Sequence, residues 1–276
     1  MFENIIGHDI NKKILCDELK NDRISHAYLF VGPKGIGKFK MAQEFAKYIL
    51  NVGNLESCPD YKCILKREDK KDILVEQIRK EVVDDVLLSP VSGNKKVYVI
   101  DDAQYLNVAA QNTLLKTLEE PPKYVVIILI SNNLSSFLPT IISRINLVNF
   151  NNISNEEVKN YISKNYKTEL SSNILQFVHG SIGNAVTIIE NNMIDKLNKI
   201  DTLFSHVKNK QAVEALNFVQ NAKLNEYEID YFEFLLYSNS YWSCVKFTQK
   251  AKNRLKMNGN YDIVCDNMIL NIIDNI

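Results

Sequence analysis

Residues 29–42 read LFVGPKGIGKFKMA, and this stretch decides the fold that we expect for the chain. An apolar run precedes the glycines and apolar residues at helical spacing follow them, which predicts a buried strand, a loop and a helix in that order. Gly32, Gly37 and Lys38 fit GxxxxGK, and Gly35 helps the loop to curl so that its N–H groups surround phosphate oxygens. The alternative is a glycine-rich turn that only joins the strand to the helix.

The residue after the lysine departs from this motif. A serine or threonine normally stands there and places its hydroxyl on Mg²⁺, whereas Phe39 offers no oxygen. We therefore expect a degenerate phosphate loop that can hold phosphate without supporting metal-assisted cleavage.

A second motif follows the apolar segment KVYVI at residues 96–100. Asp101 and Asp102 come at its end, where the ligands of open parallel sheets gather. The pair has the form of a Walker B motif, in which Asp101 would hold Mg²⁺ through water and Asp102 replaces the usual glutamate that orients the attacking water. Taken alone, two aspartates are also typical of a helix N-cap and first turn.

Strands and helices alternate as far as residue 150, which predicts an α/β fold with a parallel sheet covered on both faces. After residue 150 only helices are expected, with breaks near residues 180–183, 209 and 258–261. Helical spacing predicts one helix over residues 10–19, another over 78–86 and a third over 109–118 that ends before Pro121 and Pro122. The remaining strands are predicted at 61–65, 124–130 and 146–150.

Bulk composition excludes several classes of protein. Lysine and arginine number 33 and aspartate and glutamate number 33, so the chain has no global field that attracts nucleic acid or a membrane. No apolar stretch approaches the ~20 residues that span a bilayer, and no signal peptide is evident, so we expect a cytoplasmic protein. Five scattered cysteines argue against a disulfide framework.

Three longer strings carry a family resemblance: HAYLFVGPKGIGK from His26, AAQNTLLKTLEEPP from Ala109 and LPTIISRINLVNF from Leu138. Together they closely resemble the delta-prime subunits of bacterial DNA polymerase III clamp loaders, which are AAA+ proteins. The resemblance implies an AAA+ P-loop core at residues 1–152, a small helical lid at 153–193 and an all-helical collar at 194–276 that joins subunits in a hetero-oligomer. It also implies partners, namely motor ATPase subunits and delta, and, through the complex, the sliding clamp and primed DNA.

Ser143 and Arg144 match the SRC motif of this family, with Ile145 in place of the cysteine. The resemblance implies that Arg144 is an arginine finger, which projects towards ATP held by a neighbouring subunit. A guanidinium suits this role because it is planar, forked and always charged. The alternative is that Arg144 only stabilises the C-terminus of a helix.

Further positions follow from the same resemblance. Ser131 or Asn132 is the candidate for sensor 1, and Asn184 stands where a second sensor would be an arginine, which a neutral amide cannot replace. Many members of the family carry a four-cysteine zinc module, but Cys58 and Cys63 are too few for a closed zinc site, so we expect no zinc.

Phe39, Asp102 and Asn184 each weaken a part that hydrolysis needs. The sequence therefore favours a stator that binds ATP or ADP weakly or not at all, requires no cofactor and has no independent ATPase activity. The alternatives are an active AAA+ ATPase and a small P-loop kinase.

Local charge is concentrated near the C-terminus. Residues 246–256 carry five positive charges and no negative ones, with Lys246, Lys250 and Arg254 on one helical stripe. A solvated helix face, an acidic partner surface and a DNA backbone are all compatible with this pattern. Trp242 precedes it and is a candidate for a core or an interface position.

Overall fold

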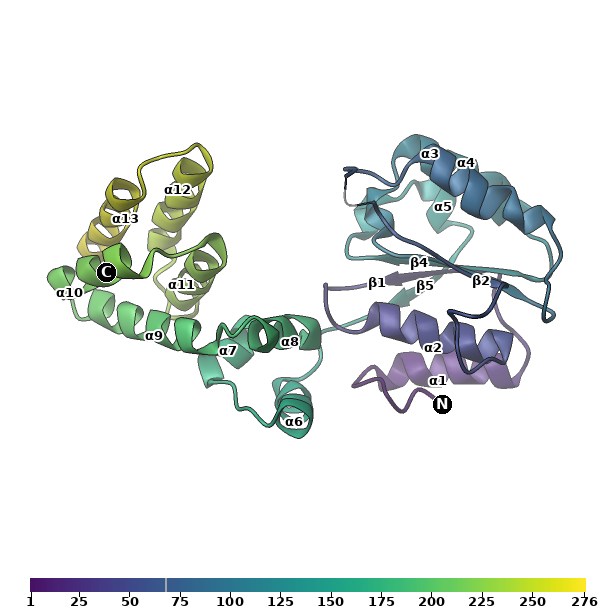
Figure 1. Ribbon diagram of the computed structural model, residues 1–276, viewed down its shortest axis with the longest axis horizontal. Helices are drawn as coiled ribbons and strands as arrows, with labels where there is room; N and C mark the ends of the chain where they lie inside the picture. The colour runs from purple at the N-terminus through teal and green to yellow at the C-terminus, as the bar shows by residue number, and fades with distance from the viewer. Residues whose placement is uncertain (68) are drawn as a thin grey trace. The chain divides into compact units, whose positions relative to one another are not determined.

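The computed structural model describes residues 1–67 and 69–276, which form two compact units (Figure 1). The first unit comprises Met1–Tyr161 and Gly180–Gly183, and the second comprises Ile162–His179 and Asn184–Ile276. The division into a core, a lid and a collar at residues 152 and 193 remains a prediction.

The first unit is built on a parallel sheet of five strands in the order β2-β3-β4-β1-β5. The predicted strands are confirmed as β1 (Ala27–Val31), β2 (Tyr61–Ile64), β3 (Lys96–Ile100), β4 (Val125–Ser131) and β5 (Asn146–Asn149). All seven residues of β4 are buried, because this central strand is covered on both faces.

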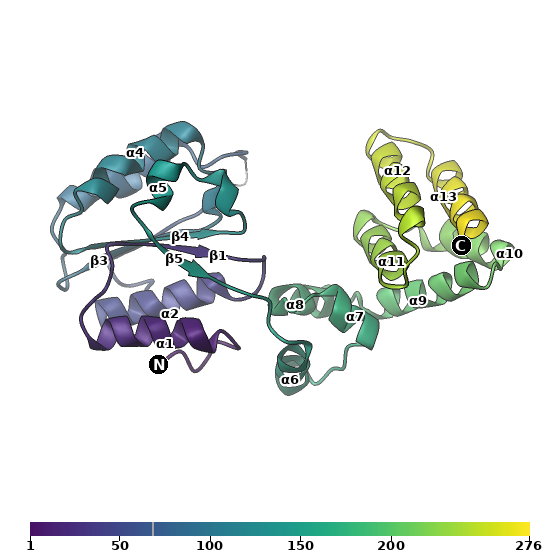
Figure 2. The same ribbon diagram turned by 180° about the vertical axis from the view of Figure 1, so that it is seen from behind.

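Helices cover the two faces of the sheet, as Figures 1 and 2 show. On one face lie α1 (Asp9–Lys20) and α2 (Lys38–Leu50), and on the other lie α3 (Val75–Ile78), α4 (Val108–Glu119) and α5 (Pro139–Ile142). Alternate residues of each strand serve the two cores, so that Tyr28 packs towards α2 and Leu29 packs towards α4. Burying each such side chain contributes about 1.5–3 kcal/mol before the loss of conformational entropy. The α/β fold class predicted from the sequence is confirmed.

The single helix predicted over residues 78–86 is wrong. The chain instead forms α3, a π-helical turn over Arg79–Val83 and a 3₁₀ turn over Asp85–Leu87. A hydrogen bond from Asp84 N to Arg79 O closes the wide turn. Ile78, Val82 and Val86 stay buried in the same core, which explains why their spacing resembled that of one helix.

The predicted first helix is present as α1, but its apolar spacing is misleading. Leu15 is fully buried, whereas Ile10 is 77% exposed and Ile14 is 45% exposed. Asn11 takes a buried position instead, because its amide donates to the carbonyl of Asn149 on the edge strand β5 at 2.9 Å.

The described residues after Asn149 contain helices and no further strand, as predicted. Ser154 and Glu157 form a capping box, with bonds of 3.1 Å from Ser154 N to Glu157 Oε2 and 3.2 Å from Glu157 N to Ser154 Oγ. The helices are α6 (Asn155–Tyr166), α7 (Ser172–Phe177), α8 (Ile182–Glu190), α9 (Ile194–Lys208), α10 (Ala212–Ala222), α11 (Glu226–Ser238), α12 (Val245–Lys256) and α13 (Tyr261–Asn275).

The predicted breaks near residues 180–183, 209 and 258–261 all fall between these helices. None of the helices described is both long and apolar enough to span a bilayer.

Candidate functional site

The glycine-rich loop joins β1 to α2 and needs its glycines for two different reasons. Gly35 and Gly37 have φ angles of 76° and 98°, in the left-handed region that favours glycine. Gly32 has an ordinary φ, but a Cβ atom there would lie 2.3 Å from the carbonyl oxygen of Phe150. The motif is therefore required by the backbone of this unit, whether or not phosphate binds.

Every carbonyl group of the loop accepts a hydrogen bond within the first unit. Lys38 Nζ donates to Gly32 O at 2.7 Å and to Pro33 O at 2.5 Å. Two donors come from residues 180–183: Ser181 Oγ donates to Lys34 O at 3.0 Å, and Gly183 N donates to Gly35 O at 2.8 Å. His8 Nε2 donates to Ile36 O at 2.7 Å, and Met41 N donates to Gly37 O at 2.9 Å. Because a carbonyl only accepts, His8 must carry a proton on Nε2.

The backbone N–H groups of residues 34–38 in the same loop, unlike its carbonyl groups, lack hydrogen-bond partners of standard geometry in the described part of the chain. Successive unpaired N–H groups at the start of a helix form an anion-binding concavity. The loop therefore fits a phosphate group, which residues 34–38 would hold through these N–H groups.

Lys38 turns back on its own loop. Its side chain is buried, and its ammonium donates to Gly32 O and Pro33 O. Burial lowers the pKa of Lys38, while the nearby carboxylates of Asp101 and Asp102 oppose that shift. The fold thus brings the predicted lysine and the predicted acidic pair together.

Phe39 does not fit a magnesium ion. Its ring is half-buried and packs against the core that contains Met41 and Phe45. The hydroxyl that would bind the metal is therefore absent from this position, and whether the loop supports metal-assisted hydrolysis stays a prediction.

The acidic pair is held by short-range bonds. Asp101 Oδ1 accepts from Asp102 N at 2.9 Å, and burial raises the pKa of Asp101. Asp102 has a φ of 50°, and its Oδ1 accepts from Gln104 Nε2 at 2.7 Å. Gln104 was not predicted, and it engages the carboxylate that would otherwise orient water.

The two candidates for sensor 1 differ in surroundings. Ser131 is buried, and its hydroxyl donates to Asn133 O and accepts from Asn133 N, both at 3.0 Å. Asn132 is exposed, and its N–H lies 3.4 Å from Gln104 Oε1. Asn184 is the third residue of α8 and is exposed. The roles of these residues as sensors remain predictions.

Arg144 follows α5 and lies at the surface, with 34% of its side chain exposed. Nη1 donates to Thr140 O at 2.8 Å and to Ser143 Oγ at 3.1 Å, and Nη2 pairs with Glu119 Oε1 at 2.9 Å. The two contacts within residues 140–144 support the base of the guanidinium. Glu119, at the end of α4, supplies a counter-charge that no sequence motif indicated.

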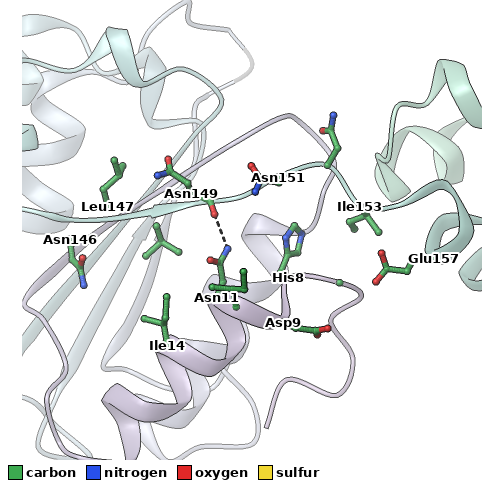
Figure 3. Close-up of a pocket in the computed structure, with 14 residues that line it drawn as sticks. His8, Asp9, Asn11, Ile14, Asn146, Leu147, Asn149, Asn151, Ile153 and Glu157 are labelled. Carbon is green, nitrogen blue, oxygen red and sulfur yellow. Dashed lines mark hydrogen bonds between the residues drawn. The ribbon is translucent and has the colours of Figure 1, made fainter.

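A groove of about 590 Å³ lies along the free edge of β5, beside the start of α1 (Figure 3). It is lined by His8, Asp9, Ile14, Leu147 and several asparagines, and the bond from Asn11 to Asn149 O crosses it. No sequence motif indicated this groove. His8 connects it to the phosphate loop through Ile36 O.

A phosphate loop after the inner strand β1, an acidic pair after β3 and a following helical region define an AAA+ type of P-loop protein. The family described as DNA polymerase III, delta subunit, matches residues 7–154. The chain belongs to this clamp-loader family of DNA polymerase III.

Proteins with similar sequences are named as subunits of DNA polymerase III. The chain is 38% identical over 136 residues to DNA polymerase III subunit delta' of Pseudomonas aeruginosa, covering 44% of this chain and 41% of that one. It is 30% identical over 220 residues to subunit gamma of Buchnera aphidicola subsp. Schizaphis graminum (72% and 60%) and 31% identical over 221 residues to subunit tau of Bacillus subtilis (74% and 38%). The chain therefore spans 60% and 38% of the lengths of the gamma and tau relatives.

Solved structures share the fold. A DNA polymerase III gamma-subunit-related protein of Thermotoga maritima superposes with a TM-score of 0.56 at 17% identity, covering 95% of this chain and 99% of that one. A variant of RuvB from the same organism gives a TM-score of 0.52 at 14% identity, covering 98% and 89%.

Proposed function

We propose that this chain is a stator subunit of a DNA polymerase III clamp loader, which supplies Arg144 to ATP bound by a neighbouring motor subunit. The observation that carries the proposal is the contrast between two positions. Arg144 is a partly exposed guanidinium at the protein surface, whereas the chain's own loop has the phenyl ring of Phe39 in place of the hydroxyl that binds metal.

The chemistry of the arginine follows from its geometry. Two short bonds within residues 140–144 hold one edge of the guanidinium, and the only carboxylate paired with Arg144 among the described residues is that of Glu119, itself 46% exposed. A neighbour's triphosphate can therefore displace Glu119 at little cost. An arginine supplied in trans to a transferring phosphate accelerates hydrolysis by ~10³ to 10⁵-fold.

The partners that go with this function are motor ATPase subunits and a delta subunit, with the sliding clamp and primed DNA reached through the complex in the cytoplasm. The chain's own loop would bind ATP or ADP weakly or not at all, because phosphate contacts are offered without a metal ligand at Phe39. No zinc is part of the proposal.

An active ATPase is the second candidate. The unpaired N–H groups of residues 34–38 and the similarity to gamma and tau subunits favour it. The kinase alternative gives no role to Ser143 and Arg144.

Reconstitution with motor subunits tests the proposal. We expect Arg144→Ala to lower the clamp- and DNA-stimulated ATPase of the assembled loader by at least about 10³-fold at full assembly, while Lys38→Ala has little effect. Arg144→Lys keeps the charge but loses the fork, and we expect it to rescue only partly. Equal, severe losses from Arg144→Ala and Lys38→Ala, or rapid hydrolysis by the purified chain alone, would assign the motor role instead.

A further inference from the structure

The structure resolves the charge of helix α12 into two faces of different character. On one face, Lys252 pairs with Asp230 at 2.7 Å and with Glu233 at 2.9 Å, and Lys256 pairs with Glu226 at 2.6 Å. These cations are neutralised by α11 and hold the two helices together. They are structural.

The other face keeps its charge. Lys246, Lys250 and Arg254 are exposed, and no carboxylate pairs with any of them within residues 1–67 and 69–276. The Lys246 ammonium lies 4.9 Å from the centre of the Phe247 ring, which fixes it without neutralising it. Since residues four apart on a helix are about 6 Å apart along its axis, three positive charges form a row about 12 Å long.

Exposed aromatic rings lie at the start of this row. Trp242 is 65% exposed and Tyr237 is 64% exposed, far more than large aromatic residues of a core. Trp242 stands in a 3₁₀ turn (Trp242–Cys244) that runs directly into α12, four residues before Lys246. Its ring is held in place, because Nε1 donates to Tyr237 O at 3.1 Å and the two rings lie 6.4 Å apart.

A groove of about 230 Å³ between α12 and α13 borders the same row. Lys250 and Arg254 line one side, and Asn267 and Asn271 line the other, each with its amide nitrogen donating one hydrogen bond to a backbone carbonyl of α13. Lysine, arginine and asparagine are the side chains that contact phosphate and sugar in nucleic-acid complexes.

We propose that Trp242 and the row Lys246, Lys250 and Arg254 form a binding site for single-stranded nucleic acid, in which a base stacks on Trp242 and successive phosphates follow the cations. Single strands bind to sites that combine a positive groove with exposed aromatic rings, because unpaired bases are free to stack. A duplex offers the cations phosphates but gives Trp242 no open base, and an acidic protein surface gives the exposed rings no specific role. The site lies wholly in the second unit and is independent of the function proposed for Arg144.

The chain provides its own reporter, since Trp242 is the one tryptophan of the sequence. We expect (dT)₁₂ to quench the fluorescence of Trp242. A plot of log Kd against log salt concentration should have a slope of about 2, because each phosphate neutralised on a single strand contributes about 0.7 and the row offers three cations. Anisotropy of labelled (dT)₁₂ gives an independent Kd.

Three variants separate the contributions. The triple change Lys246→Ala, Lys250→Ala and Arg254→Ala is expected to weaken binding at least about tenfold in low salt and to flatten the salt dependence. Trp242→Leu is expected to weaken binding about fivefold to a hundredfold with the salt dependence unchanged. The matched control removes three exposed lysines of α9 in the same unit, Lys196, Lys199 and Lys208, and should change the affinity less than twofold.

Circular dichroism melts establish that each variant is folded. Absence of quenching by (dT)₁₂, equal losses from the α9 control and the α12 triple variant, or equal affinity for poly-glutamate and (dT)₁₂ without quenching would each overturn the proposal. The last result would assign the row to an acidic protein partner. Because Arg144→Ala is read by ATPase activity of the loader, the failure of one proposal leaves the other intact.

Discussion

Replacing Glu119 by glutamine measures how tightly Arg144 is held within its own chain. The pair is bridged at 2.9 Å, but 34% of the Arg144 side chain and 46% of the Glu119 side chain are exposed. Ion pairs that are this exposed contribute only about 0.2–1 kcal/mol. In the role proposed for Arg144, breaking the bridge to reach a neighbour's phosphate would therefore cost at most about a factor of five in rate.

We accordingly expect Glu119→Gln to raise the ATPase rate of the reconstituted loader slightly, by up to about fivefold, and to leave the melting temperature of the isolated chain nearly unchanged. The matched control is Glu120→Gln, since Glu120 is the adjacent exposed glutamate and has no ion pair among the described residues. ATPase is measured at saturating subunit concentrations, so that assembly does not limit the rate. A loss of tenfold or more for Glu119→Gln, with Glu120→Gln at the wild-type rate, would refute this reasoning and show that the carboxylate positions the finger.

Three further changes test the fold around the site. The buried ammonium of Lys96 lies 3.0 Å from Asp85 Oδ2, and Asp85→Asn removes this negative charge. We expect the free energy of unfolding in denaturant to fall by about 3 kcal/mol. A fall below about 0.5 kcal/mol would contradict this account. Gly32→Ala forces a Cβ to within 2.3 Å of a carbonyl oxygen and should cost about 1–3 kcal/mol, whereas Gly53→Ala meets nothing within 4 Å and should be neutral; equal melting temperatures would show that the loop yields freely. Burial lowers the pKa of His8 from its ordinary 6.5, so the unfolded chain binds the proton more readily than the folded chain does. The free energy of unfolding should therefore fall as the pH drops below 6.5, and His8→Gln should flatten this dependence. Parallel pH profiles of stability for the wild type and His8→Gln would exclude the reasoning.

The three inner strands β1, β3 and β4 could be predicted from the sequence because each is a largely apolar run that is buried on both faces, whereas the edge strands β2 and β5 are only partly buried. The helices were predicted less accurately where the buried residues are not the ones with apolar spacing. Ile10 and Ile14 suggested the core face of α1, yet that face is completed by Asn11, whose amide satisfies an edge carbonyl that no local pattern reveals. Over residues 78–86 the apolar spacing is preserved through a π turn, which a count of residues cannot distinguish from a regular helix.

The loop and the acidic pair could be found because their chemistry lies in contiguous residues. The partners of these residues could not, because the chain supplies them from distant positions. His8 and Ser181 reach the loop across 28 and 147 residues, and Glu119 reaches Arg144 from a different helix. Nothing in the local sequence around His8 or Glu119 indicates such a bond.

The glycines of the phosphate loop are therefore weak evidence for hydrolysis, although they are strong evidence for the fold. Gly32 is required by the approach of Phe150, and at Gly183 a Cβ would lie 2.8 Å from the Cα of Gly35. Loss of catalysis would relax neither constraint, since both are contacts between backbones within the first unit. Position 39 has no such backbone constraint, because its side chain packs against an apolar core in which the phenyl ring fits. Residues that serve only the chemistry can thus change while the glycine pattern stays, so position 39 bears more directly on the proposed stator role than the glycines do.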